Sequence, residues 1–259
     1  MIRSGVYKEL RMKVSIITPV YNEPRIADTL ESIFSQRDVP ELEVIVIDGE
    51  STDKTTDILD EYQEKIDVLV RESDEGVYDA MNTGISLATG DIIGILNADD
   101  RYQHPDVLRT VVNTFNETET DICYGNLVYV NSDDSVVRYW KSGPYASQKF
   151  YFGWMPPHPT VFVRRGMYKK YGTFDLEFEI AADYEFLLRL LVEEAVPATY
   201  INEVLVRMSI GGQSNRSLSN IFNANVEVAK SWQKHNHRFG PLVGIIKPLR
   251  KITQYVKKP

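Results

Sequence analysis

The sequence of 259 residues lacks several features that define broad classes of protein. Cys123 is its single cysteine, which excludes an intrachain disulfide and a cysteine-rich metal site and fits a reducing cytoplasm. There is no run of about 18 apolar residues and no visible signal peptide, so we expect no transmembrane helix. A basic excess is also lacking, since the net charge is −8, and this argues against nucleic acid as a partner.

Two glycine-rich nucleotide-binding motifs are absent as well. Neither G-x-G-x-x-G nor G-x-x-x-x-G-K-[ST] occurs in the chain. At the first predicted turn from strand to helix, Pro19 and Tyr21 stand where a dinucleotide-binding fold would need glycine. The classes of NAD-binding and P-loop proteins are therefore excluded.

Short β-branched segments alternate with helical periodicities in the first hundred residues. Strands are expected at residues 14–18, 43–47, 68–71 and 91–96, with amphipathic helices between them. This alternation predicts an α/β fold with a mostly parallel central sheet and flanking helices. Further along, we expect strands at residues 122–130, 135–140, 160–164 and 198–208, helices at 105–117, 181–194 and 217–235, and an aromatic-rich loop at 143–157.

Each of the first four predicted strands leads into acidic residues. These include Glu23, Asp48, Asp74, Asp99 and Asp100. Because ligands of open parallel sheets bind beyond the carboxyl ends of the strands, these acids are expected to crowd one edge of the sheet. Crowded carboxylates raise one another's pKa unless a cation compensates, and Mg²⁺ or Mn²⁺ bound with a pyrophosphate would do so. The alternative is that they cap helices, which we prefer for Asp53 but not for Asp99 and Asp100.

Four segments in order resemble the sequence blocks of family 2 glycosyltransferases. They are residues 14–23 (VSIITPVYNE), 46–55 (VIDGESTDKT), 75–84 (EGVYDAMNTG) and 90–100 (GDIIGILNADD). The resemblance implies a GT-A fold, in which residues 1–115 form the half that binds a nucleotide sugar and residues 116–237 the half that binds the acceptor and carries the catalytic base. Residues 238–259 would be a basic C-terminal tail. The third block resembles the sub-group that acts on bacterial surface or extracellular polysaccharides.

The resemblance also implies a set of donor-binding residues: Pro19, Tyr21, Glu23, Asp48, Asp74, Asp99 and Asp100. In this set, Asp48 would contact the base, and Asp99 and Asp100 would meet the diphosphate and a Mg²⁺ or Mn²⁺ ion. The sequence departs from many relatives at Asn97, where they have Asp. Asparagine can still ligate through its oxygen, but it brings no charge, so a lower metal affinity is expected.

Inverting transfer of a sugar requires a general base for the acceptor hydroxyl. Asp183 is our candidate because it begins a predicted helix after two small residues, where the resemblance implies a base; relatives often have Glu where Ala182 stands. The alternative is a carboxylate that only favours the helix N-terminus. Glu185 is the reserve candidate.

Three further side chains are candidate contacts of the acceptor. His158 lies in an expected extended loop, where it would contact the acceptor or a phosphate, or serve as a structural hydrogen-bonding group. Trp140 and Trp154 could stack on acceptor sugars, although aromatic side chains are more often part of the core.

The C-terminal segment is basic, with six basic and no acidic residues from 238 to 259. Residues 240–259 mix these charges with apolar side chains, a composition drawn to anionic lipid at about 1 kcal/mol per charge. Peripheral attachment to the inner face of the cell membrane and a solvated or subunit-packed tail are both open.

These observations predict an inverting glycosyltransferase. It would move a sugar from a UDP- or GDP-linked donor to a hydroxyl of a glycan or lipid-linked glycan acceptor. A sugar nucleotidyltransferase is the first alternative, but the first loop lacks the glycine, arginine and lysine that triphosphate binding needs. A catalytically inactive sugar-binding GT-A protein is the second, and the presence of Asp99, Asp100 and Asp183 argues against it.

Overall fold

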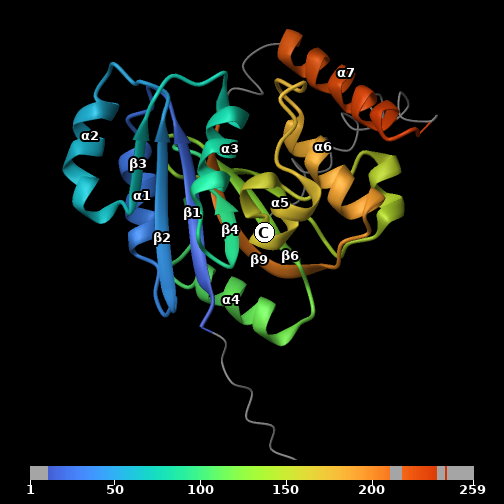
Figure 1. Cartoon of the computed structure of the whole chain (residues 1–259), viewed down its shortest axis with the longest axis horizontal. Coiled ribbons are helices and arrows are strands. Elements are labelled where there is room, and N and C mark those ends of the chain that lie inside the picture. The colour runs from blue at the N-terminus through green and yellow to red at the C-terminus, as the bar shows by residue number, and fades with distance from the viewer. Residues whose placement is uncertain (1–10, 211–217, 238–242, 244–259) are drawn as a thin grey trace, which may run out of the picture.

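The computed structural model describes residues 11–210, 218–237 and 243, and the chain is shown in Figure 1. The predicted tail, residues 238–259, lies outside the described residues apart from Val243. None of the helices among the described residues is long and apolar enough to cross a membrane.

Nine strands within the described residues form one sheet in the order β3-β2-β1-β4-β8-β6-β9-β5, with β7 paired to β6. The strands are β1 (Lys13–Val20), β2 (Glu41–Asp48), β3 (Val68–Arg71), β4 (Ile92–Ile95), β5 (Asp100–Tyr102), β6 (Ile122–Val130), β7 (Val136–Trp140), β8 (Phe162–Arg164) and β9 (Ala198–Ser209). The α-helices are α1 (Ile26–Phe34), α2 (Thr55–Tyr62), α3 (Val77–Leu87), α4 (Val107–Glu117), α5 (Arg165–Tyr171), α6 (Ala182–Leu188) and α7 (Leu218–Lys234).

The first four strands in the chain run parallel to one another. β1 pairs with β2 and β4, and β2 pairs with β3, each in parallel register. Val20 lies opposite Asp48 and Asp48 opposite Arg71, so these strands end together at one edge of the sheet, the upper edge in Figure 1. We call this the carboxyl edge. The predicted α/β fold with a mostly parallel sheet and flanking helices is confirmed for this half.

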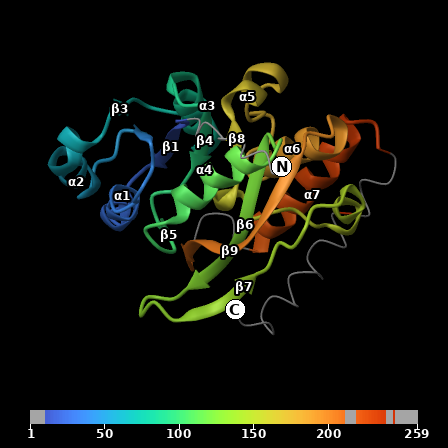
Figure 2. The ribbon, with the colours of Figure 1, turned by 90° about the horizontal axis from the view of Figure 1, so that it is seen from below.

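Residues of the second half complete the same sheet in mixed directions. β8 runs antiparallel to both β4 and β6, whereas β6 and β9 are parallel. Figure 2 shows β6 and β9 side by side with β7 next to them. β5 comes from the first half but pairs with β9, with Asp100 opposite Met208. The two predicted halves therefore share one continuous sheet.

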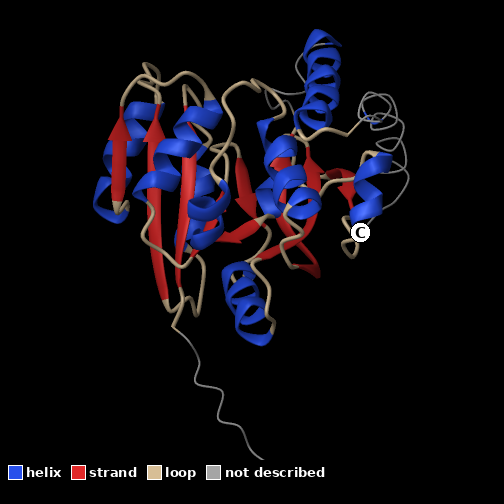
Figure 3. Cartoon of the chain, turned by 45° about the vertical axis from the view of Figure 1, so that its right-hand side comes forward, coloured by secondary structure: helices blue, strands red, loops and turns tan. Residues whose placement is uncertain are grey.

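Alternating side chains on the parallel strands feed two hydrophobic cores, one on each face. Val44 and Val46 of β2 pack with α1, α2 and α4, whereas Ile45 and Ile47 pack with α3 and with the second half. Figure 3 shows helices on both faces of the sheet. Gly84 lets α3 approach β1 closely, since a Cβ there would lie 2.4 Å from Cγ2 of Ile17.

A buried carboxylate ties strands together at the opposite edge of the sheet. Glu43 accepts hydrogen bonds from the hydroxyls of Ser15 and Thr89 and from the backbone N–H of Thr89. Lys13 Nζ lies 2.9 Å from Glu43 Oε1. Burial raises the pKa of Glu43, but these donors outweigh it and lower the pKa to about 2.

The structure departs from the predicted elements at four places. β5 and α5 were not predicted, and the helix expected at 181–194 changes from α-helix to π-helix at Arg189–Glu193. The aromatic-rich loop includes a 3-10 helix at Ser147–Phe152 and packs Phe150 and Trp154 into the core.

Candidate functional site

Asp48 ends β2 at the carboxyl edge and is buried, with 1% of its surface exposed. Its Oδ1 accepts a hydrogen bond from the backbone N–H of Ser51 at 3.0 Å. Its Oδ2 is buried and has no hydrogen-bond partner in the part of the chain that the structure describes; Arg71 Nε lies 3.9 Å away. A buried acceptor without a donor is costly, so this oxygen is suited to an N–H group of a ligand.

Tyr21 and Asp74 come together beside Asp48, over Gly49. A Cβ at Gly49 would lie 2.6 Å from Oδ2 of Asp74 and 3.6 Å from Cδ2 of Tyr21, so a larger residue there would displace the Asp74 carboxylate. The Tyr21 side chain is 59% exposed, which leaves its ring open to a ligand. Pro19 is buried within β1, opposite Ile47 of β2.

The loops after β1 and β2 are joined by Asn22, which sequence reasoning missed. Asn22 adopts a left-handed backbone with φ of 48°, which its short polar side chain tolerates. Its Oδ1 accepts from the backbone N–H of Thr52, and its own N–H donates to Ser51 Oγ, both at 2.8 Å. Asp53 accepts from the backbone N–H of Thr55, the first residue of α2, at 2.9 Å, but the N-cap position of this helix is Lys54 and no side chain caps it.

The predicted acidic pair follows β4 at the same edge. Asp100 is buried, and its Oδ2 accepts from Asn97 Nδ2 at 3.3 Å. Burial, and then the neighbouring Asp99 carboxylate, raise the pKa of Asp100 well above its usual range. The hydroxyl of Ser209, at the end of β9, donates to the Asp99 carbonyl at 2.9 Å, so the second half holds this pair in place.

Arg25 provides positive charge at this site. Its guanidinium donates to both carboxylate oxygens of Glu23, at 2.7 and 2.6 Å, and Nη2 lies 3.5 Å from Asp99 Oδ2. The predicted donor residues Glu23 and Asp99 are thus brought together by a side chain that sequence reasoning missed. The spacing of Arg25 two residues after Glu23 was the available signal.

The side-chain oxygens at the acidic pair fit a hard divalent cation as ligands. Oδ1 of Asn97 and Oδ1 of Asp100 are buried, and neither has a hydrogen-bond partner among the described residues. Mg²⁺ and Mn²⁺ prefer oxygen ligands and keep part of their coordination shell for water and phosphate. Among the described residues, no group of three or more His, Cys, Asp or Glu side chains is arranged to hold a metal ion by itself, so phosphate oxygens of a bound nucleotide would have to complete the coordination of a cation here.

Asp183 contacts the first turn of α3, the helix that follows Asp74. The hydroxyl of Tyr78 lies 3.3 Å from Oδ1 of Asp183 and donates to the carbonyl of Ile180 at 2.9 Å. Oδ1 of Asp183 also accepts from the backbone N–H of Tyr184 at 2.8 Å. Asp183 therefore stands in the first turn of α6, next to the half of the molecule that carries the acidic pair.

His158 lies close enough to Asp183 for the carboxylate to act on its pKa. Burial lowers the pKa of His158, and the Asp183 carboxylate opposes that effect. Its ring meets Phe174 edge-on, with centroids 5.5 Å apart. The structure thus brings His158 together with the candidate base.

Two of the predicted site residues are buried. Trp154 is 2% exposed, and its indole N–H donates to the Ser142 carbonyl at 2.8 Å, so the ring belongs to the core, the alternative that the sequence favoured over stacking on a sugar. Glu185 is 1% exposed, with Arg189 at 2.9 Å and His235 at 2.9 Å. Because both of its oxygens are used in a buried ion-pair cluster, Glu185 is not a reserve base.

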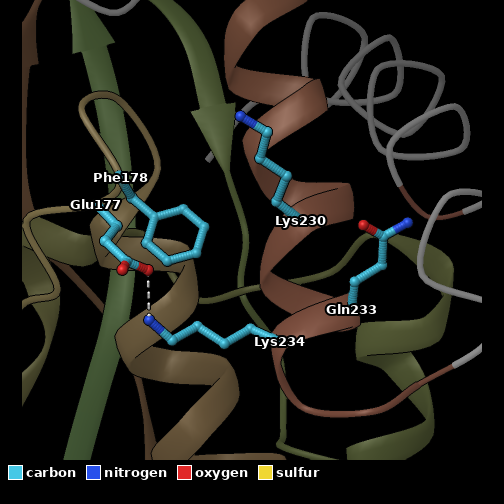
Figure 4. A pocket seen from close by; sticks show the side chains of 5 residues that line it. All are labelled: Glu177, Phe178, Lys230, Gln233 and Lys234. Carbon is cyan, nitrogen blue, oxygen red and sulfur yellow. Dashed lines mark hydrogen bonds and ion pairs between the residues drawn. The ribbon is translucent and has the colours of Figure 1, made fainter.

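A surface pocket beside α7 lies apart from these residues. Figure 4 shows its lining of Glu177, Phe178, Lys230, Gln233 and Lys234. Lys234 pairs with Glu177 at 2.8 Å and also with Asp175, so its charge is already matched. None of the predicted site residues lines this pocket.

Comparison with known proteins gives the family. The model of Glycosyl transferase family 2 matches residues 15–172. A PGL/p-HBAD biosynthesis glycosyltransferase from Mycobacterium tuberculosis is 30% identical over 206 residues, which are 78% of this chain and 78% of that protein.

Two solved structures share the fold. S. aureus TarS 1-349 in complex with UDP-GlcNAc aligns with a TM-score of 0.62 at 20% identity over 84% of this chain, which spans 66% of the length of that TarS chain. The mannosyltransferase PcManGT from Pyrobaculum calidifontis, in complex with GDP-Man and Mn²⁺, aligns with a TM-score of 0.64 at 20% identity over 95% of this chain and 74% of that one. The resemblance seen in the sequence and the GT-A-like fold are confirmed. The chain belongs to Glycosyl transferase family 2 and is a glycosyltransferase.

Proposed function

We propose that this glycosyltransferase is an inverting enzyme. It moves a sugar from a UDP- or GDP-linked donor to a hydroxyl of a glycan or lipid-linked glycan in bacterial surface or extracellular polysaccharide synthesis. One observation carries the proposal: buried oxygens of Asp48, Asn97 and Asp100 lack hydrogen-bond partners among the described residues, and all three lie at the carboxyl edge. Such atoms are costly unless a ligand supplies donors or a cation, and a nucleoside diphosphate with a divalent ion supplies both.

The donor would lie along the carboxyl edge from Tyr21 to the acidic pair. Asp48 Oδ2 would accept an N–H of the base, with the exposed Tyr21 ring beside it and Asp74 near the base or ribose. Asp99 and Asp100, with Asn97 Oδ1, would hold Mg²⁺ or Mn²⁺. The ion would supply positive charge for the diphosphate that departs. In support, TarS and PcManGT were solved with UDP-GlcNAc and with GDP-Man and Mn²⁺.

Asp183 would act as the general base. Its carboxylate takes the proton from the acceptor hydroxyl while that oxygen bonds to the anomeric carbon. The bond between the anomeric carbon and the phosphate oxygen breaks, and the nucleoside diphosphate leaves with the electron pair. Attack from the face opposite the leaving group inverts the anomeric centre. His158, which lies near Asp183, would contact the acceptor or a phosphate.

The basic segment at residues 240–259 would bring the enzyme to the inner face of the cell membrane, where lipid-linked acceptors are present. Co-sedimentation with anionic liposomes, comparing the full chain with a chain of residues 1–239, checks this part. Full-chain partitioning that falls on truncation supports it, and equal partitioning of both chains contradicts it.

The central experiment screens UDP- and GDP-sugars, including UDP-GlcNAc and GDP-Man, for release of nucleoside diphosphate with and without Mn²⁺. Calorimetric titration with UDP and GDP runs in parallel. We expect one nucleoside diphosphate to bind more tightly when Mn²⁺ is present, and the matching sugar nucleotides to be hydrolysed or transferred. If Mn²⁺ does not change the affinity for UDP or GDP, or if neither nucleotide binds, the assigned donor site is refuted.

A further inference from the structure

The segment that leads into α6 is held by a carboxylate from α7. The backbone N–H groups of Glu179, Ile180 and Ala181 donate to the two oxygens of Glu227, at 3.2, 2.9 and 2.8 Å. Hydrogen bonds to an ionised acceptor are roughly twice as strong as neutral ones. Three of them on consecutive residues fix the backbone directly before Asp183.

The same segment is held from the other side by α3. The carbonyl of Ile180 accepts from the hydroxyl of Tyr78 at 2.9 Å, so this one residue is fixed at its N–H by α7 and at its C=O by α3. The hydroxyl also lies 3.3 Å from Asp183 Oδ1, and its single proton is shared between the two acceptors. Burial, and then the charge of Asp183, raise the pKa of Tyr78 well above its usual value, so Tyr78 remains a donor.

One turn further along α3, Asn82 joins the two halves a second time. Its side-chain amide donates to the Phe174 carbonyl and accepts from the Phe174 N–H, both at 2.9 Å. The Phe174 ring contacts Tyr78 and His158, each with centroids 5.5 Å apart. Residues four apart lie on one face of a helix, so this face of α3 is directed at the Asp183 region.

α7 is itself rigidly attached, which gives Glu227 a fixed origin. Trp232, fully buried, donates its indole N–H to the Tyr184 hydroxyl at 2.9 Å. Val228 and Ser231 of the same helix are also fully buried. Figure 1 shows α7 beside α6, and contacts between them connect the end of the described chain to the catalytic region.

We propose that Tyr78 and Glu227 are positioning residues for Asp183, which hold its carboxylate in line with the acceptor from opposite sides. The inference rests on the proposed role of Asp183 as the base. It adds α7, which lies beyond the segment matched by the family model, to the elements required for turnover. Removal of the Tyr78 or Glu227 side chain would displace the Asp183 carboxylate but would not weaken binding of the nucleotide sugar.

The test compares Tyr78→Phe, Glu227→Gln and Glu227→Ala with the wild-type chain. The rate measured is nucleoside diphosphate release from whichever nucleotide sugar is turned over fastest, with water as acceptor. A misplacement of the order of 1 Å costs on the order of a hundredfold, so we expect kcat to fall about tenfold in Tyr78→Phe and about thirtyfold in Glu227→Ala. Glu227→Gln, which keeps an acceptor oxygen, should lie between Glu227→Ala and the wild type. KM and the affinity for the nucleoside diphosphate should stay within about twofold.

Tyr62→Phe is the matched control, because it also removes a hydroxyl that donates to a carboxylate. That hydroxyl donates to Glu31 at 2.6 Å, between α2 and α1. We expect the Tyr62→Phe substitution to leave kcat unchanged. Amide hydrogen exchange at residues 179–181 should speed up in both Glu227 variants, which is a readout independent of activity.

The outcomes separate the two levels of the proposal. If Asp183→Asn abolishes turnover while Tyr78→Phe and both Glu227 variants keep kcat within twofold, the positioning role is overturned and the base stands. If donor affinity falls in proportion to kcat in these variants, the residues serve general folding and the inference is again overturned. If Asp183→Asn turns over normally, the proposed function itself fails. Should Glu227→Ala not fold, Tyr78→Phe and Glu227→Gln carry the test.

Discussion

Replacing Asp100 with asparagine should stabilise the ligand-free protein and abolish its activity. Asp100 is 1% exposed, lies beside the Asp99 carboxylate and has one oxygen without a hydrogen-bond partner among the described residues. The amide of asparagine has nearly the same shape, carries no charge and could donate to the unpartnered Oδ1 of Asn97. The variant therefore removes electrostatic repulsion while removing a proposed cation ligand.

We expect the Asp100→Asn variant to be more stable than the wild type without ligand and less stable with it. Stabilising substitutions of this kind commonly add about 0.5–2 kcal/mol, which for a protein of this size raises Tm by about 1–4 °C. In the wild type, nucleoside diphosphate and Mn²⁺ at 100 times the Kd should add about 2.7 kcal/mol, and the variant should lose most of that gain. The order of the two melting temperatures should therefore reverse when ligand is added.

Thermal unfolding with EDTA, with Mn²⁺ alone and with Mn²⁺ plus UDP or GDP tests this reversal. Asp38→Asn is a suitable control, because its exposed carboxylate pairs with Arg109 at 2.8 Å on the surface and should be worth about 0–1 kcal/mol. A ligand-free Asp100→Asn protein that melts below the wild type would refute the reasoning. It would show that the carboxylate stabilises the fold instead of being held there at a cost.

Three further outcomes are expected. Asp183→Asn should fold normally and lower kcat at least about a hundredfold in the nucleotide-release assay, since proton transfer by a positioned base contributes about 10²–10⁴; near-normal turnover would count against the role. The pKa of Glu43 is about 2 against an ordinary 4.5, so about 3 kcal/mol of stability should be present above pH 4.5 and lost as the pH falls toward 2. Urea unfolding at several pH values would detect it, and Glu43→Gln should flatten that dependence. Gly84→Ala should cost about 1–3 kcal/mol in the same urea assay, because its Cβ would lie 2.4 Å from a buried methyl of Ile17; an unchanged midpoint would mean that α3 can shift freely.

The parallel half of the fold was predictable because its strands carry their own signal. In this half, residues 68–71 were expected as a strand and coincide with β3; in the second half, residues 122–130 likewise coincide with β6. At least half of the side chains in each segment are β-branched or aromatic. β5 could not be predicted in this way. Its three residues, Asp100–Tyr102, are mostly polar, and they form a strand because β9 supplies their partners from a hundred residues away.

The candidate site shows the same division between local and distant causes. Asp48 and the acidic pair were expected at one edge because parallel strands must end there, and the register places them so. Asp183 was expected from a resemblance in the chain, but its partner Tyr78 was not, and neither was Glu227, which binds the backbone of residues 179–181. Their hydrogen bonds join residues from three helices, and no local spacing encodes such a contact.

The burial of Trp154 and Glu185 also depends on distant contacts. Trp154 meets Tyr124 of β6 edge-on, and Glu185 meets His235 beyond α7. The position of a tryptophan or glutamate along the chain does not show which way its side chain points.

The interleaving of the sheet has a consequence for attempts to redesign this enzyme. Gly94 of β4 lies opposite Phe162 of β8, and a Cβ there would lie 2.6 Å from the aromatic ring. Asp100, in the first half of the chain, likewise owes its backbone pairing to β9. A chimera joined near residue 115 would have to form both strand pairings, β4 with β8 and β5 with β9, between residues that come from different parent proteins. New acceptor preferences are therefore better introduced by grafting surface loops onto the intact sheet than by exchanging halves between relatives.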